Sequence, residues 1–215
     1  MKKSFLLLVA LCAITFVSCE DEGDDKPANV LMPFAVGNTW TYNSERENGE
    51  STTVTQTIEK SFTVDGKTGF SYEKEVSTDK SFGLLNTDKN GSIVELHFKD
   101  GKYVDQSVLF KIDAKEGEKY KAKMAVFSGD NADYELEETD MTCVKRDTSI
   151  TVAAGTFNCI CYCMTLYDNN TLSNKFYYFY SVNVGMVKNT RYEFPSSDKD
   201  SVMMNNITLK SYELK

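Results

Sequence analysis

The stretch Asn86–Gly101, NTDKNGSIVELHFKDG, decides the fold class of this chain. Apolar and polar side chains alternate through its second half, in the order Val94, Glu95, Leu96, His97, Phe98 and Lys99. A period of two is typical of a β-strand with one buried face and one solvent face. Asn90-Gly91 and Asp100-Gly101 flank the alternation, and such pairs favour tight hairpin turns. The stretch therefore predicts a hairpin strand that exposes His97 to solvent.

The same pattern extends outward over most of the chain. Segments rich in Thr, Val, Tyr and Phe are separated by Gly, Asn and Asp residues, and few segments show a helical period. We expect strands over residues 39–46, 51–64, 69–78, 81–87, 92–98, 103–113, 119–127, 134–146, 148–152, 156–167, 175–182, 185–193 and 203–214. A series of this length protects its edges by curving into a barrel or folding into a sandwich. The prediction is a single, mainly antiparallel β domain over residues 29–215, an open or curved barrel first and a β-sandwich second.

The amino terminus has the layout of a secretory signal. Two lysines near the start precede an apolar run over residues 5–17, and the small residue Ser18 stands before Cys19. The apolar run is too short for a helix that crosses a bilayer. We therefore expect residues 1–18 to be a signal peptide that is removed on export.

The stretch that ends at Cys19 resembles a bacterial lipobox, with Phe16 in place of the usual leucine, as in lipoproteins of Bacteroidetes. The resemblance implies that the Cys19 thiol carries a lipid, and several acyl chains anchor a protein stably. It also implies a surface-export signal in the acidic residues that follow, which are Glu20, Asp21, Glu22, Asp24 and Asp25. Residues 19–28 then form a lipidated tether, and the implied location is the outer membrane, exposed at the cell surface.

The charge of the chain argues against nucleic acid as a partner. Without residues 1–18, the 24 basic residues fall by two lysines to 22, against 32 acidic ones, which gives a formal charge of −10. Binding to a polyanion requires clustered Lys and Arg that release its counterions, and the sequence has no such cluster. The partners that we expect are the membrane, through the lipid anchor, and a glycan, an apolar small molecule or an envelope protein.

Three short segments resemble a pattern found in uncharacterised, β-rich bacterial lipoproteins. They are Pro33–Tyr42, with the form P-x-x-x-G-N-x-W-x-Y, then Val152–Phe157 with A-G-T-F, and Asn183–Lys188 with V-G-x-V-K. The resemblance implies an open, strongly curved barrel of the lipoprotein-carrier type, whose concave face holds an apolar ligand, and it brings no catalytic residue. From the residues alone, the glycines predict turns and a bulge that deliver Trp40 and Tyr42 to one face of the first strand.

Four cysteines downstream of the tether leave two interpretations open. Cys159, Cys161 and Cys163 alternate, so a strand points all three thiols to one face. A straight strand spreads such residues too far apart to favour a zinc site, and we expect no metal and no cofactor. Export makes a disulfide between Cys143 and one of the three plausible. Buried, unpaired thiols are the other interpretation.

Aromatic residues supply the candidate ligand surface. The run Phe176–Tyr180, FYYFY, is apolar on both faces of a strand, so at least one face is core. Tyrosine rings offer flat apolar area together with a hydroxyl, which suits a cavity wall or stacking against a sugar. The predicted ligand residues are Trp40, Tyr42, Phe176, Tyr178 and Tyr180. Separately, Asp200-Ser201-Val202 resembles a Bacteroidetes O-glycosylation motif, with Ser201 as the acceptor.

The sequence favours a protein that is not an enzyme. His97 is the only histidine and lies on a predicted polar face, and no phosphate-binding glycine loop is present. Carboxylate pairs such as Glu135 and Glu137 occur by chance in so acidic a chain. We expect a lipid-anchored envelope lipoprotein that acts as a binding or interaction module. The alternatives are a surface glycan hydrolase that uses a carboxylate pair and a structural accessory of an envelope complex.

Overall fold

The computed structural model describes residues 27–72, 82–127, 134–195 and 201–215. This described part is all β and contains no helix. None of its segments forms a helix with the length and hydropathy needed to span a membrane. Its strands are β1 (Thr39–Arg46), β2 (Ser51–Thr57), β3 (Lys60–Val64), β4 (Lys67–Ser71), β5 (Phe82–Thr87), β6 (Ile93–Lys99), β7 (Lys102–Phe110), β8 (Lys119–Phe127), β9 (Tyr134–Val152), β10 (Gly155–Asp168), β11 (Thr171–Ser181), β12 (Gly185–Glu193) and β13 (Val202–Glu213).

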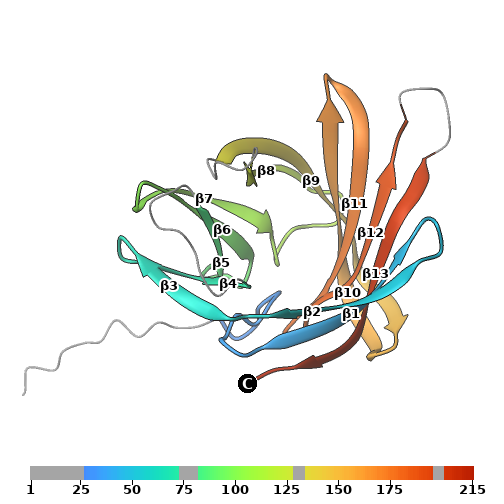
Figure 1. Ribbon diagram of the computed structural model, residues 1–215, viewed down its shortest axis with the longest axis horizontal. Coiled ribbons are helices and arrows are strands. Elements are labelled where there is room, and N and C mark those ends of the chain that lie inside the picture. Colours follow the sequence, from blue (N-terminus) through green and yellow to red (C-terminus); the bar gives the residue numbers. More distant parts are fainter. Residues whose placement is uncertain (1–26, 73–81, 128–133, 196–200) are drawn as a thin grey trace, which may run out of the picture.

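The strands form two antiparallel sheets (Figure 1). The larger sheet has eight strands in the order β2-β1-β13-β12-β11-β10-β9-β8, so the first and last strands of the chain pair in it. The smaller sheet is the meander β3-β4-β5-β6-β7. The large sheet curves round so that its β8 end lies beside β7, but the two sheets do not close into a barrel. The open, curved arrangement agrees with the predicted fold class.

Most predicted strands are confirmed to within a few residues, and two differ for clear reasons. Of the strand predicted over 69–78, β4 contains residues up to Ser71, and residues 73–78 lie outside the described residues. The segment predicted as one strand over 51–64 divides after the buried Ile58, where the chain changes its pairing partner. The Ile58 N–H donates to the Asn38 carbonyl next to β1, whereas the Glu59 N–H donates to the Ser71 carbonyl at the end of β4. Conversely, the chain from 134 to 152 is a single strand, although a break was expected near Asp147. Asp147 has a φ of 55°, so a left-handed residue interrupts the regular backbone without ending the strand.

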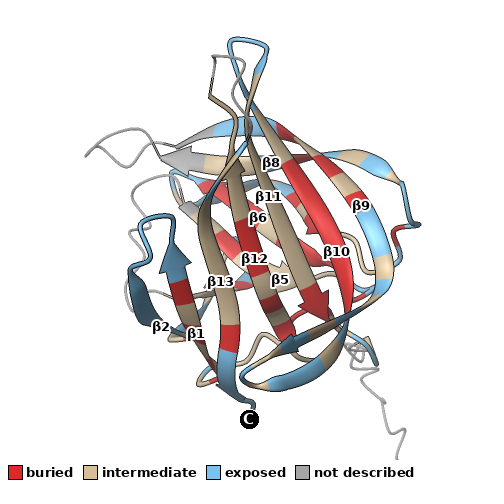
Figure 2. Ribbon diagram, turned by 90° about the vertical axis from the view of Figure 1, so that its right-hand side faces the viewer, coloured by how far each residue is buried: buried red, intermediate tan, exposed pale blue. Residues whose placement is uncertain are grey.

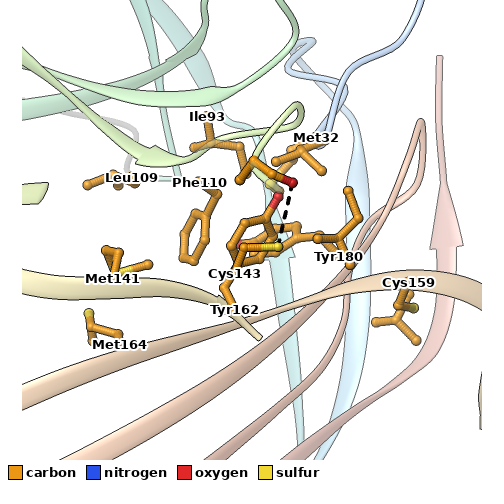
Figure 3. Packing of buried hydrophobic residues seen from close by; sticks show 14 of the residues in the cluster. Met32, Ile93, Leu109, Phe110, Met141, Cys143, Cys159, Tyr162, Met164 and Tyr180 are labelled. Atoms are coloured by element: carbon orange, nitrogen blue, oxygen red, sulfur yellow. Dashed lines mark hydrogen bonds between the residues drawn. The ribbon is translucent and has the colours of Figure 1, made fainter. Parts of the chain in front are cut away.

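The main hydrophobic core lies between the two sheets. Phe110, at the end of β7, reaches across and packs on three tyrosines of the large sheet, with ring centroids 5.3 Å from Tyr162, 5.0 Å from Tyr178 and 4.7 Å from Tyr180. Figure 3 shows Phe110 enclosed together with Leu109 and Ile93 from the small sheet. One aromatic side chain therefore joins the two sheets.

The junction between β7 and β8 is closed by side chains. Within the described strands no ladder pairs them, yet two N–H groups of β8 find acceptors: Lys123 N–H donates to Ser107 Oγ (2.7 Å) and Ala125 N–H donates to Glu95 Oε2 (3.2 Å). The Lys123 ammonium also contacts the Asp105 carboxylate (3.1 Å). Polar side chains of β6 and β7 thus accept hydrogen bonds from N–H groups of the edge strand β8, which would otherwise be unpaired.

His97 is buried, contrary to the sequence prediction of a surface residue. The alternation in β6 is real, because Val94, Leu96 and Phe98 all lie in one buried cluster. The opposite face, however, is covered at the β8 junction instead of facing solvent. There His97 Nε2 lies 3.1 Å from Glu95 Oε2. A period of two predicts which residues share a face, but another element decides whether that face meets water.

The three segments that resemble the lipoprotein pattern meet at one end of the core. The Trp40 indole is fully buried and donates to the Val184 carbonyl (2.7 Å). A Cβ at Gly185, where φ is +107°, would lie 3.0 Å from Trp40 Nε1, so only glycine fits there without strain. Ala154 of the middle segment donates its N–H to the Leu209 carbonyl on the neighbouring β13. These motifs are therefore explained by packing.

Asn38 fixes the entry into β1. Its side-chain amide donates to the Pro33 carbonyl (2.6 Å), its Oδ1 accepts from the Lys215 N–H (2.8 Å), and its backbone carbonyl accepts from the Ile58 N–H. The residue is almost fully buried, so each of these bonds satisfies a group that water does not reach. Gly37 precedes it with a φ of 89°, which supplies the turn that the sequence predicts.

Candidate functional site

The outer face of the large sheet carries aromatic residues on β11 and β12. Register pairs Tyr177 with Thr190 and Phe179 with Lys188, and directly paired residues point to the same face. This face is opposite to the one that packs on Phe110, because side chains alternate along a strand. Figure 2 views the large sheet from this outer side, with β11 coloured mostly as intermediate in burial. The side chains that line it are thus only partly covered.

A hollow of about 390 Å³ lies on this face, and we call it the aromatic groove. It is lined by Tyr177, Phe179, Lys188, Thr190, Tyr192, Phe194 and Ser201. The Tyr177 and Tyr192 rings meet edge to face, with centroids 5.8 Å apart and an interplanar angle of 87°. Edge-to-face contact fixes the two rings relative to each other and leaves part of each ring open. The groove therefore presents rigid aromatic area beside hydroxyl groups and one ammonium.

Two lysines lie against the aromatic rings of this surface. Lys188 Nζ is 5.9 Å from the centre of the Phe179 ring, and Lys175 Nζ is 5.4 Å from that of Phe194. An ammonium over a ring face is attracted by the ring's quadrupole, which holds the long side chain near the surface. Both charges are thereby placed at the aromatic groove.

Two further hollows adjoin the aromatic groove. One, of about 420 Å³, shares Tyr177 with it and extends over β8, β9 and β10, where Cys163, Thr165 and Lys175 are among the lining residues. The other, of about 510 Å³, shares Phe194 and lies at the β10–β11 turn, where Asp168 and Glu193 contribute carboxylates. Shared residues make the three hollows neighbours on one surface, which suits an extended ligand better than a small compact one.

Of the residues predicted to bind ligand, three are buried in the core and two are partly buried against it, and none of the five lines the aromatic groove. Trp40 and Tyr42 are at most 1% exposed and Tyr180 is 7% exposed. Phe176 and Tyr178 stack on each other and pack against the core cluster. The aromatic run does supply a surface, but with Tyr177 and Phe179, the alternate residues that face the other side of β11. Sequence reasoning also missed Tyr192 and Phe194. A signal for Tyr192 was present, because Lys188, Thr190 and Tyr192 alternate along β12 and pair with the outward-facing residues of β11.

The four cysteines of the described residues are free thiols, and the bridge from Cys143 that the sequence leaves open is absent among them. Strand register explains this result, because Cys143 lies opposite Tyr162 instead of opposite a cysteine. Its thiol points into the core, towards the Ala114 carbonyl at 3.7 Å, and Figure 3 shows Cys159 well apart from it. Cys161 and Cys163 lie on the outer face, where Tyr177 and Phe179 are their cross-strand neighbours. Burial of unpaired thiols is the interpretation that holds.

These thiols are expected to resist alkylation in the native protein. Burial raises the pKa of the Cys159 and Cys161 thiols to about 12, so at pH 8 almost none is thiolate, the reactive form. Because the native state favours the neutral thiols, their contribution to stability is present below pH 9.0, the ordinary pKa of an exposed thiol, and is lost as the pH rises towards 12. Reaction with iodoacetamide at pH 8, with and without urea, checks the expectation. Rapid native labelling of Cys161 would contradict it.

Several of the positions predicted to carry a modification or an export signal lie partly or wholly outside the described residues. Ser201 lines the aromatic groove and is exposed, whereas Asp200 of its motif lies outside the described residues. Cys19 and the acidic residues 20–25 also lie outside them. Within the described part of the chain, no group of three or more His, Cys, Asp or Glu side chains is arranged to hold a metal ion.

Two solved structures resemble this chain. One is described as a "putative lipoprotein" of Parabacteroides distasonis, with 15% identity and a TM-score of 0.43, covering 86% of this chain and 99% of that one. The other is described as a "putative exported protein with YmcC-like fold" of Bacteroides fragilis, with 13% identity and a TM-score of 0.38, covering 85% of this chain and 98% of that one. No protein-family model matches the chain, and no curated protein does. Both likenesses are distant, and no function follows from them.

Proposed function

We propose that this protein is a lipid-anchored, non-catalytic glycan-binding module of the cell envelope. The observation that carries the proposal is the aromatic groove on the outer face of the large sheet. It places four half-buried aromatic rings beside the hydroxyl of the exposed Ser201. Sugar rings pair apolar C–H faces with hydroxyls, so such a surface matches both of their properties.

The anchor rests on the sequence around Cys19. A lipidated chain partitions with membranes, because several acyl chains bury many methylenes at roughly 0.8 kcal/mol each. Replacing Cys19 by serine removes the thiol that would carry the lipid, so the variant is expected in the soluble envelope fraction. Fractionation of cells that express the natural chain and the variant measures this shift. Recovery of both in the same fraction would contradict the anchor.

The groove has the properties of a binding surface more than those of a reaction site. The one charged side chain among the seven that line the groove is Lys188, and no carboxylate is among them. Glycoside hydrolysis requires two carboxyl groups on opposite sides of the scissile bond. The neighbouring hollow does contain Asp168 and Glu193, and this is the observation that favours a surface glycan hydrolase as the second candidate.

Truncating the groove's tyrosines is expected to weaken glycan binding. Tyr177→Ala and Tyr192→Ala each remove one ring of the edge-to-face pair, and loss of stacking area at the groove should reduce affinity about tenfold, since a ring contact is worth roughly 1 kcal/mol or more. A saccharide array followed by calorimetry on the chain from residue 20 onward measures the change.

Tyr212→Ala is the matched control, because Tyr212 is 37% exposed and lies outside the groove. Its affinity should equal that of the natural chain. Absence of any saccharide binding would refute the proposed function. Release of new reducing ends during the titration would instead favour the hydrolase.

A further inference from the structure

We propose that the aromatic groove recognises an acidic glycan, a saccharide chain whose rings carry carboxylate groups. This inference rests on the proposed function and names its ligand class. It is carried by the placement and the unpaired state of Lys175 and Lys188. Neither residue figured among the candidates from the sequence.

The two lysines mark the two ends of the aromatic surface. Lys188 pairs with Phe179 across β11 and β12, and Lys175 pairs with Tyr192. Four residues along β11 separate these two rows, which corresponds to roughly 13 Å at the rise of an extended strand. Tyr177 lies between the rows, in register with Thr190. A chain laid along β11 thus meets an ammonium, an aromatic surface and a second ammonium in turn.

Neither lysine is neutralised by a carboxylate of the described residues. Three other lysines of the described residues do contact a carboxylate: Lys121 contacts Asp140 at 2.8 Å, Lys123 contacts Asp105 at 3.1 Å, and Lys111 contacts Glu118 at 3.1 Å. At the groove the ammonium groups instead lie over Phe179 and Phe194. A cation–π contact leaves the positive charge unbalanced, so the charge remains available to an anion on a ligand.

The rest of the chain makes this arrangement selective. The predicted mature protein carries a formal charge of −10, and long-range repulsion therefore opposes any densely charged polyanion. Nucleic acid requires a stripe of basic residues to replace its counterions, and two lysines do not provide one. A saccharide with well-spaced carboxylates needs only a few local cations, and its uncharged ring faces match the aromatic residues between them. Charge and shape together favour an acidic glycan.

The test compares two oligosaccharides of equal length, an oligogalacturonate and a neutral malto-oligosaccharide, by calorimetry with the chain from residue 20 onward. The acidic probe should bind at least tenfold more tightly at low salt, and added salt should reduce the difference, because partly exposed charges are screened. Lys175→Gln and Lys188→Gln should each weaken the acidic probe about fivefold, which is the size expected for a partly exposed ion pair, and weaken the neutral probe clearly less. Lys210→Gln, an exposed lysine on β13 outside the groove, is the matched control.

The outcomes separate this inference from the proposed function. Equal affinity for both probes, or unchanged affinity in the two groove variants, would overturn the acidic ligand while glycan binding stands. Failure of every saccharide to bind would overturn the proposed function itself. Tighter binding of a single-stranded oligonucleotide than of either saccharide would overturn the selectivity argued from net charge.

Discussion

Replacing Trp40 by alanine is expected to destabilise the protein by about 4 kcal/mol, the range found for large aromatic residues removed from cores. Trp40 is the largest fully buried side chain, and Gly185 lies so close to it that a Cβ there would be 3.0 Å from the indole nitrogen. Its indole N–H also satisfies the Val184 carbonyl, so the substitution leaves that acceptor without its donor. Both effects have the same sign.

Urea unfolding followed by circular dichroism measures the change in the free energy of unfolding. Val54→Ala serves as the control, because Val54 lies on the neighbouring strand β2, is 44% exposed and should change stability by less than about 0.5 kcal/mol. Trp40→Phe separates the two effects, since it keeps most of the ring but removes the donor. A loss in Trp40→Ala no larger than that in Val54→Ala would refute the packing role.

The same contacts explain what the recurring sequence pattern means. Trp40 and Gly185 belong to segments separated by more than half of the chain, yet they touch. The middle segment contacts β13, the strand that pairs with β1, through the Ala154 N–H. A pattern of this kind preserves a packing arrangement. It is therefore compatible with many ligands, and the site must be argued from other residues.

The strands were predictable because their signals are local. For β8 and β12, the bounds predicted from alternation and turn residues, 119–127 and 185–193, are the same as the bounds in the structure. Burial of a polar face was not predictable in the same way. Glu95 and His97 form a solvent face by pattern, but they meet β8, which follows some thirty residues later and whose edge needs acceptors. Such contacts depend on tertiary pairing that no local pattern contains.

The site was half predictable for a related reason. In the run Phe176–Tyr180 both phases are aromatic, so the sequence identifies the strand but not the outward face. The decision comes from Phe110, which packs on Tyr178 and Tyr180 and thereby turns Tyr177 and Phe179 outward. A one-residue change in register would exchange the two sets completely. The residue that selects the outward face of β11 therefore lies in the other sheet.

Phe110→Ala is accordingly expected to have two measurable effects. Loss of its ring should lower stability by about 3 kcal/mol, because Phe110 is 7% exposed and contacts three tyrosines of the opposite sheet. Saccharide affinity should fall as well, because the packing that positions β11 loosens. Unfolding is followed by the fluorescence of Trp40, the only tryptophan.

The control for this substitution is Val104→Ala, on the same strand β7 but 54% exposed, which should leave both stability and affinity near those of the natural chain. A Phe110→Leu variant tests whether apolar volume alone maintains the junction, since it fills part of the cavity without restoring the ring contacts. If Phe110→Ala unfolds at the same urea concentration as Val104→Ala, the two sheets are joined by other contacts. The polar bonds between β8 and the side chains of Glu95 and Ser107 would then be the principal link, because they bridge the same junction.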